Sequence, residues 1–255
     1  MTLAATLFPG DARLRLVTGI PPSVMKDTPA IKQDIPQALV GTYHYTYHSS
    51  RGSRQVVLVI ESVVAMMEGV PAMYVHSTPS KPIGLIDIGG HSFDVAFLDR
   101  HGKIVDTRTR SLIGQAVARA GEILSEQFRK RHGRGLKANE INDAYTAFLA
   151  RESLTVYHRG AIELTPDMTG LAFAQVAEAQ MAFLSKYWAD GDQHQIGADA
   201  ERVLIIGGGG LMFPPYLRIA TQVIIPDNPF EENARSYQIF AERIEARQSW
   251  PRIEG

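Results

Sequence analysis

The sequence predicts an α/β fold, because two strand-like apolar runs that end in glycines enclose a long helical stretch. The first run, Ile83–Ile88, is followed by Gly89-Gly90, and the second, Val203–Ile206, is followed by Gly207–Gly210. Short apolar runs bounded by glycines are typical of buried strands. Residues 112–188, between the two runs, show helical spacing of their apolar residues. The pattern therefore favours a sheet with helices packed against it.

Composition and charge exclude several classes of protein. The 255 residues are 45% hydrophobic and 21% charged, as in a globular protein of one large or two small domains. Cysteine is absent, which excludes disulfides and thiolate metal sites. No apolar run approaches the ~18–20 residues of a membrane helix, and a net charge of -1 gives no sign of binding to nucleic acid or an anionic membrane. We therefore expect a cytoplasmic protein that contacts neither nucleic acid nor membrane directly.

The first half of the chain is expected to be rich in strands. Alternating or continuous apolar runs predict them, and Asp99-Arg100-His101-Gly102 has the composition of a hairpin turn. The expected strands are residues 12–19, 38–47, 56–60, 73–76, 83–88, 93–98 and 103–109. The last three of them are expected to lie side by side, and residues 62–67 are expected to form a short helix.

The second half is expected to be mainly helical. In residues 112–131 the apolar side chains recur every three or four positions, which predicts an amphipathic helix, and Gly133 follows it as a C-terminal cap would. Further helices are expected at residues 139–151, from Thr165-Pro166 onward, and at 231–246. Strands are expected at residues 202–206, in a sheet layer next to that of residues 83–110, and at 222–225.

The two glycine loops suggest a ligand as well as a turn. Glycine tolerates positive φ and lets the backbone come close to a bound group, and converging backbone N–H groups bind anions such as phosphate. If both loops face one cleft, they predict a nucleotide held there. A dinucleotide-binding enzyme is a competing interpretation, but it needs G-x-G-x-x-G opening a helix early in a βαβ unit. Gly207–Gly210 lies late in the chain, and Phe213-Pro214-Pro215 disrupts the start of a helix.

Four segments, taken together, resemble motifs of the actin-like ATPase superfamily. Asp87-Ile88-Gly89-Gly90-His91-Ser92-Phe93-Asp94 resembles its second phosphate loop, Asp-x-Gly-x-x-(Thr/Ser)-x-Asp, and Val203–Gly210 resembles its adenosine motif. Val17-Thr18-Gly19-Ile20-Pro21 and the segment from Ile225-Pro226-Asp227 to Asn233-Ala234-Arg235-Ser236 are similar to motifs of the plasmid-segregation actins, the ParM/StbA group, and their archaeal relatives. The resemblance spans residues 12–245.

This resemblance implies an actin-like, ribonuclease H-like α/β fold with a nucleotide cleft between two lobes. Residues 1–82 would be the remnant of the first lobe with a crossover helix, and residues 83–255 would be the second lobe. The family's first phosphate loop, Asp-x-Gly-x-x-x-x-Lys/Thr, is not found before residue 17, so the fold is expected to be N-terminally incomplete. A truncated protein, one half of a split protein and a degenerate scaffold all fit this departure.

The resemblance also implies a set of site residues. Asp87 would hold Mg²⁺ through water, as suits a cation that keeps much of its hydration shell, and Glu61 would orient the attacking water; both are candidate catalytic residues. The nucleotide, ATP or GTP, would contact Gly89, Gly90, His91, Ser92, Asp94, Gly207, Gly208, Gly209 and Gly210. Structural alternatives are a turn at Asp87 and at the glycines, a solvent-facing carboxylate at Asp94, and a surface residue at a helix N-terminus for Glu61.

The implied function is Mg²⁺-dependent hydrolysis of ATP or GTP coupled to filament assembly, in a protein of the plasmid-segregation type. The partners would be further copies of the chain and a DNA-bound adaptor protein. Nucleoside-triphosphatase activity is expected when the first phosphate loop is supplied. The alternative is a non-hydrolysing structural or filament-associated protein. Tyr74-Val75 and Phe213-Pro214-Pro215-Tyr216 are each either a filament contact or part of the core.

Overall fold

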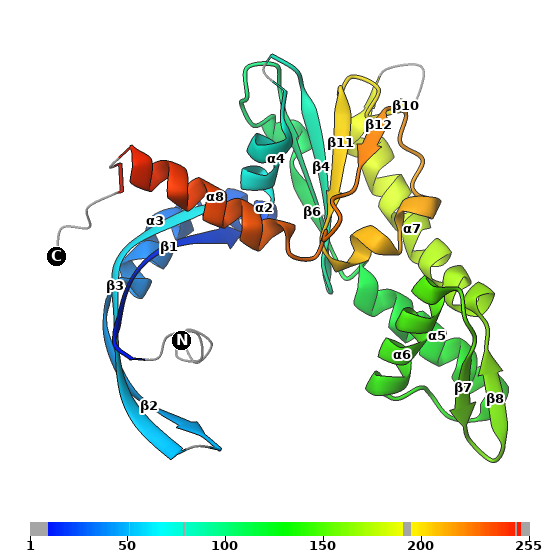
Figure 1. Ribbon diagram of the computed structural model, residues 1–255. Helices are drawn as coiled ribbons and strands as arrows, with labels where there is room; N and C mark the ends of the chain where they lie inside the picture. The colour runs from blue at the N-terminus through cyan, green and yellow to red at the C-terminus, as the bar shows by residue number, and fades with distance from the viewer. Residues whose placement is uncertain (1–9, 51, 79, 191–194, 248, 251–255) are drawn as a thin grey trace. The chain divides into compact units, whose positions relative to one another are not determined.

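The computed structural model describes residues 10–50, 52–78, 80–190, 195–247 and 249–250 (Figure 1). The chain divides into two compact units. Unit 1 is built from both ends of the chain, Met1–Pro71 and Ala234–Gly255, and unit 2 from the single stretch Ala72–Asn233. These units do not coincide with the halves expected on either side of residue 82, because the C-terminal helix groups with the N-terminal strands.

Unit 1 contains a three-stranded sheet and helices. In spatial order the strands are β1 (Ala12–Ile20), β3 (Gly52–Met67) and β2 (Gly41–Ser49). β1 is parallel to β3, and β2 is antiparallel to it. The helices are α2 (Pro22–Asp27), α3 (Ile31–Leu39), the start of α4 (Val70–His76), and α8 (Glu232–Ala246) from its third residue onward.

Two contacts of α8 with β1 explain its place in unit 1. Arg15 on β1 donates two hydrogen bonds to the carboxylate of Glu245, at 2.9 and 2.7 Å. The ring of Tyr237 lies directly over Gly19, where a Cβ would be 2.1 Å from the Tyr237 hydroxyl oxygen. Only glycine at position 19 lets the helix approach the strand this closely.

β3 is longer than the sequence predicts, and the prediction of a helix at residues 62–67 is wrong. The strand continues for 16 residues to Met67. Its buried side chains Val63, Ala65 and Met67 recur at every second position, which is the period of a strand. Periodicity alone does not separate helix from strand in so short an apolar run. Pairing with β1 along residues 62–67 decides the outcome.

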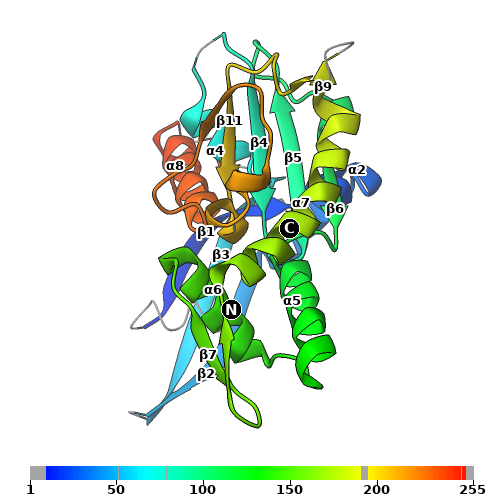
Figure 2. The same cartoon turned by 90° about the vertical axis from the view of Figure 1, so that its right-hand side faces the viewer.

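Unit 2 is organised around a five-stranded mixed sheet (Figure 2). Its spatial order is β12 (Gln222–Ile224), β11 (Arg202–Ile206), β4 (Ile83–Ile88), β5 (Ser92–Leu98) and β6 (Arg110–Ile113). β12, β11 and β4 are parallel to one another, whereas β5 is antiparallel to both of its neighbours. The expectation that β11 belongs to a neighbouring layer is therefore wrong, since it pairs directly with β4. Both strands are buried on two faces, which explains their uninterrupted apolar runs.

Two expected strands of unit 2 have a different structure. Residues 73–76 belong to helix α4. The strand expected at residues 103–109 is reduced to an isolated bridge between Leu98 and Ile104 and a 3-10 turn, η1 (Asp106–Arg108). The buried hydroxyl of Thr109 closes this turn by donating to the carbonyl oxygen of Val105 at 3.0 Å, and the third strand of the group, β6, begins only after it.

The remaining elements of unit 2 are mostly helical. The long helices are α5 (Val117–His132), α6 (Ala138–Ala150) and α7 (Pro166–Trp188), close to the helices expected there. The shorter elements are the hairpin β7 (Leu154–Tyr157) and β8 (Ala161–Leu164), the pair β9 (Ala189–Asp190) and β10 (Gln195–Ile196), and the 3-10 turns η3 (Gly208–Leu211) and η4 (Pro214–Tyr216). No helix within the described residues is long and apolar enough to cross a membrane.

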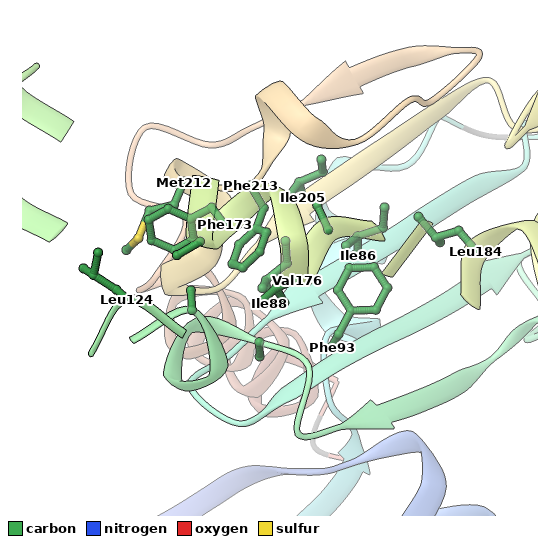
Figure 3. Close-up of a cluster of buried hydrophobic side chains, with 14 of the residues drawn as sticks. Ile86, Ile88, Phe93, Leu124, Phe173, Val176, Leu184, Ile205, Met212 and Phe213 are labelled. Carbon is green, nitrogen blue, oxygen red and sulfur yellow. The ribbon is translucent and has the colours of Figure 1, made fainter. Parts of the chain in front are cut away.

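The core of unit 2 lies between one face of the sheet and the helices (Figure 3). Its members shown there come from β4, β5, β11, α5, α7 and the segment after the second glycine loop: Ile86, Ile88, Phe93, Leu124, Phe173, Val176, Leu184, Ile205, Met212 and Phe213. The fully buried ring of Phe213 packs edge-on against Phe173, with 5.1 Å between ring centroids. Phe213 is therefore a core residue, and it fixes the chain that leaves the second loop.

A partly buried ion pair anchors the start of α6. Arg134 donates from both terminal nitrogens to Glu140, at 2.7 and 2.8 Å, and the backbone N–H of Lys137 donates to the same carboxylate at 2.7 Å. The hydrogen bonds from Arg134 are the main cause that lowers the pKa of Glu140 from 4.5 to about 2. A carboxyl whose pKa is lowered by folding stabilises the fold above its unfolded pKa and loses that effect as the pH falls.

We therefore expect Glu140→Gln to lower the free energy of unfolding by about 1–3 kcal/mol at pH 7. The difference from the wild type should shrink as the pH falls from about 4.5 towards 2. Urea unfolding at a series of pH values measures it. Glu126→Gln is the control, because the Glu126–Arg129 pair is 40% and 61% exposed and such pairs contribute little. An effect of Glu140→Gln that does not change with pH would contradict the assignment.

Candidate functional site

The two glycine loops lie next to each other at one edge of the unit 2 sheet. β4 and β11 are parallel neighbours, and Asp87 near the end of β4 pairs with Ile206 at the end of β11. The loops that follow, Gly89-Gly90 and Gly207–Gly210, therefore leave the sheet at the same edge. In α/β proteins this carboxyl edge of the strands is where ligands bind.

The second loop is pressed against the end of β4. Gly207 has a φ of 80°, and a Cβ there would lie 2.4 Å from Oδ1 of Asp87 and 2.5 Å from the carbonyl oxygen of Ile88. A Cβ on Gly209 would lie 2.4 Å from Cγ2 of Ile88. Side chains at either position would collide with β4, so both glycines are needed to hold the two loops together.

Gly208 is the glycine of this loop that faces open space. A Cβ on Gly208 would meet no atom within 4 Å, whereas one on Gly210 would lie 3.2 Å from Cβ of Pro229. The entropic cost of glycine at position 208 has no packing reason within the chain. Close approach of a ligand to the backbone at this position would supply one.

The first loop is fixed by hydrogen bonds that leave two N–H groups available. The N–H of Gly89 donates to the carbonyl oxygen of Ser92 at 2.9 Å, and the N–H of Ala118, in the first turn of α5, donates to that of Gly90 at 2.8 Å. Gly90 and His91 are exposed. Within the described part of the chain, their own N–H groups donate to no protein acceptor. Such neighbouring backbone donors suit an anionic group.

Asp87 is held in place by a residue that we did not predict. Its side chain is 5% exposed, and Nδ2 of Asn233 donates to its Oδ2 at 2.6 Å. The two residues are 146 positions apart in the chain. Asn233 lies in a segment that resembles a family motif, but nothing in the sequence connects that segment with Asp87.

Asp94 is a buried carboxylate and not a solvent-facing one. It lies directly opposite Asp87 in the β4–β5 pairing and is 2% exposed. The Ser92 hydroxyl donates to its Oδ2 at 2.6 Å, while its Oδ1 is buried without a hydrogen-bond partner. Burial raises the pKa of Asp94, against the opposing hydrogen bonds from Ser111 and Ser92.

These side chains fit a hydrated divalent cation. The described residues include no group of three or more His, Cys, Asp or Glu side chains that could hold a metal ion by themselves. Asp87 and Asp94 supply carboxylate oxygens, and both Asp94 and Asn233 have a buried Oδ1 without a hydrogen-bond partner. All of these donors are oxygen atoms, and there are too few for a complete protein cage. Mg²⁺ characteristically binds through one or two carboxylates and keeps several waters.

Glu61 does not begin a helix, which was the structural alternative for it. It lies within β3, where the pairing with β1 skips it between Leu14 and Arg15, so it forms a β-bulge that re-aims its side chain. Its carboxylate accepts a hydrogen bond from Arg13 at 3.0 Å and lies 3.4 Å from Nε of Arg15. The hydrogen bond from Arg13 is the largest cause that lowers the pKa of Glu61. A lowered pKa makes a carboxylate a weaker base.

The chain has the fold of the actin-like ATPases. The solved structures that it matches include a hybrid from Bacillus thuringiensis that contains two ParM mutants with ADP (14% identity, TM-score 0.71). They also include the actin-like protein Alp7A (12%, 0.74) and Ta0583, an archaeal actin homologue (17%, 0.72). The matches cover 96%, 94% and 94% of this chain.

The chain is shorter than the proteins that it resembles. It spans 35% of the length of the hybrid, which holds two ParM mutants, 70% of Alp7A and 74% of Ta0583. No protein-family model matches the sequence, and no curated protein matches it.

Proposed function

We propose that this protein is an actin-like nucleotide-binding protein of the plasmid-segregation type, in which Mg²⁺-dependent hydrolysis of ATP or GTP is coupled to filament assembly. The observation that carries the proposal is the placement of both glycine loops around Asp87 at one edge of the unit 2 sheet. The partners would be further copies of the chain and a DNA-bound adaptor protein. A net charge of -1 favours an adaptor over direct contact with DNA.

The structural neighbours support the nucleotide and the assembly. Structures of ParM from Bacillus thuringiensis are described with ADP, ATP and AMPPNP. Another neighbour is a quadruple mutant of pCBH ParM that is described as non-polymerisable. ATP is therefore the nucleotide to test first, with GTP as the comparison.

Each group of the site has a separate proposed role. When bound, Mg²⁺ would neutralise charge on the phosphates, and Asp87 would hold it through water. The N–H groups of Gly90 and His91 would donate to phosphate oxygens, and the open side of Gly208 would face the nucleoside. Catalysis of this kind depends on positioning and charge neutralisation, so the rigidity of both loops matters more than any reactive side chain.

We keep Glu61 as the residue proposed to orient the attacking water, with Glu68 as the matched control. Glu68 directly follows Met67, the last residue of β3, and its N–H donates to the carbonyl oxygen of Ile20, the last residue of β1, at 2.8 Å. It thus lies outside β3, whereas Glu61 lies within it. Glu61 is engaged by two arginines.

Matched variants test this assignment. Glu61→Gln is expected to lower ATP turnover by roughly 10²-fold or more, the effect of losing a group that accepts or positions a proton. Glu68→Gln should retain turnover within a few-fold, because no role in the reaction is proposed for this residue. Phosphate release measures turnover, and calorimetry with ADP and Mg²⁺ should show unchanged binding in both. Turnover by Glu61→Gln equal to that of the wild type would contradict the assignment.

The alternative is a non-hydrolysing actin-like structural or filament-associated protein, and the engagement of Glu61 by Arg13 and Arg15 favours it. Light scattering of the wild type with ATP, with AMPPNP and without nucleotide separates the two functions. Assembly with ATP that reverses as phosphate is released supports coupled hydrolysis. Binding and assembly without phosphate release would establish the alternative, and the absence of nucleotide binding would exclude both.

A further inference from the structure

Asn233 has one hydrogen-bonding group satisfied and one left over. Its Nδ2 donates to Oδ2 of Asp87 at 2.6 Å, whereas its Oδ1 is buried and has no hydrogen-bond partner. The orientation of the amide follows from chemistry, because only the N–H end of the amide forms a favourable bond with a carboxylate. The oxygen is therefore turned away from the atom that Asn233 holds.

A buried acceptor without a partner is unfavourable, and native proteins rarely leave one without a reason. Here a second such acceptor belongs to the strand partner of Asp87, since Oδ1 of Asp94 is also buried and unpaired. Two unpaired oxygens on the two residues that adjoin the Asp87 carboxylate point to a shared missing donor. Water molecules carried by a cation donate hydrogen bonds and would satisfy both oxygens.

We propose that Asn233 is a positioning residue for the cation of this site. Its N–H group fixes the orientation of the Asp87 carboxylate, and its Oδ1 accepts a hydrogen bond from a water of the hydrated Mg²⁺. The proposal rests on the proposed function, which places the cation at Asp87. It adds a protein group to that site that makes no bond to the metal and acts through Asp87 and through water.

The position of Asn233 in the chain gives this contact a second consequence. Asn233 is the second residue of α8 and the last residue of unit 2. The preceding residue, Glu232, is 1% exposed and accepts a hydrogen bond from Nε2 of His76 at 2.8 Å. The first turn of α8 is thus bonded to the ends of both β4 and α4. Occupation of the cation site should therefore make this turn more rigid.

The first experiment measures the dissociation constant of ADP with Mg²⁺ and with EDTA. In the wild type, Mg²⁺ should tighten binding by at least tenfold. Asn233→Ala and the similarly sized apolar Asn233→Leu should both lose most of that gain. Both should still bind ADP in EDTA within about threefold of the wild type, because the substitutions remove only the Mg²⁺-dependent part of the affinity. Asn228→Ala is the control, since Asn228 bonds to Glu231 on the exposed surface of the same segment.

The outcomes separate this inference from the proposed function. If Mg²⁺ does not affect ADP binding by the wild type, the cation site itself is wrong. If the wild type shows the effect and either folded Asn233 variant keeps it, the cation site stands and the role of Asn233 is wrong. Hydrogen exchange of the wild type gives a readout without mutation. Amides of residues 233–237 should exchange several-fold more slowly with Mg²⁺–ADP than with ADP in EDTA, and equal rates would overturn the proposal.

Discussion

Asp87→Asn is expected to abolish the Mg²⁺-dependent part of nucleotide affinity and to leave the fold intact. Asparagine has the size of aspartate, and its carbonyl oxygen still accepts the hydrogen bond from Asn233. The substitution therefore removes the charge that attracts the cation and keeps an acceptor for Nδ2 of Asn233. Calorimetric titration with ADP, in Mg²⁺ and in EDTA, should show equal and weak binding under both conditions.

Two further variants define what the Asp87 result means. Asp87→Ala should show the same loss of Mg²⁺ dependence with an additional loss of stability, because Nδ2 of Asn233 is then buried without an acceptor. Asp143→Asn, an exposed position on α6, should behave as the wild type. Mg²⁺-dependent binding that persists in Asp87→Asn would show that the cation, if bound, lies elsewhere.

Gly208→Val is expected to weaken nucleotide binding strongly while the melting temperature stays within about 2 °C of the wild type. The new side chain would enter the space where a Cβ meets no protein atom within 4 Å, so it costs the fold little and occupies the place proposed for the ligand. We expect at least a tenfold loss of ADP affinity. Thermal unfolding and calorimetry on the same sample measure both quantities.

Gly209→Val serves as the contrasting variant. From the structure we expect it to lower stability, whereas Gly208→Val should not. The family resemblance suggests a valine that blocks the adenine, but a Cβ at this position points into the protein, 2.4 Å from Cγ2 of Ile88. Overpacking of this kind costs about 1–3 kcal/mol, so Gly209→Val should lower the melting temperature whether or not ligand is present. Normal ADP binding by Gly208→Val would remove the second loop from the proposed site.

The part of the site that could be predicted is the part encoded locally. A buried parallel strand leaves an uninterrupted apolar run in the sequence, and a loop in close contact with a neighbour leaves glycines. β4, β11 and their loops carry both signals within a few residues. This is why the existence of the strands and loops follows from the sequence, although the direct pairing of the two strands does not. Asp87 became a candidate only through the family resemblance of the first loop.

The parts that could not be predicted depend on partners distant in the chain. Glu61 was taken for a residue at the end of a strand, because the run that follows it fits a helix as well as a strand, and only pairing with β1 extends β3 past it. Asn233 could not be linked to Asp87, since hydrogen bonds between distant residues leave no periodic pattern. The hairpin β7–β8 was missed because its strands have only four residues each.

The order of the two units along the chain has a consequence for synthesis on the ribosome. Unit 2 is one uninterrupted stretch, Ala72–Asn233, whereas unit 1 needs α8 from the end of the chain to cover β1. Domains commonly fold as units while the chain is still emerging. Unit 2 can therefore acquire its structure before translation ends, but the strands made first must wait for the last helix. The sheet of unit 1 thus spends most of translation without its covering helix. During this interval the face of β1 that α8 later covers is exposed, and a chaperone could bind it.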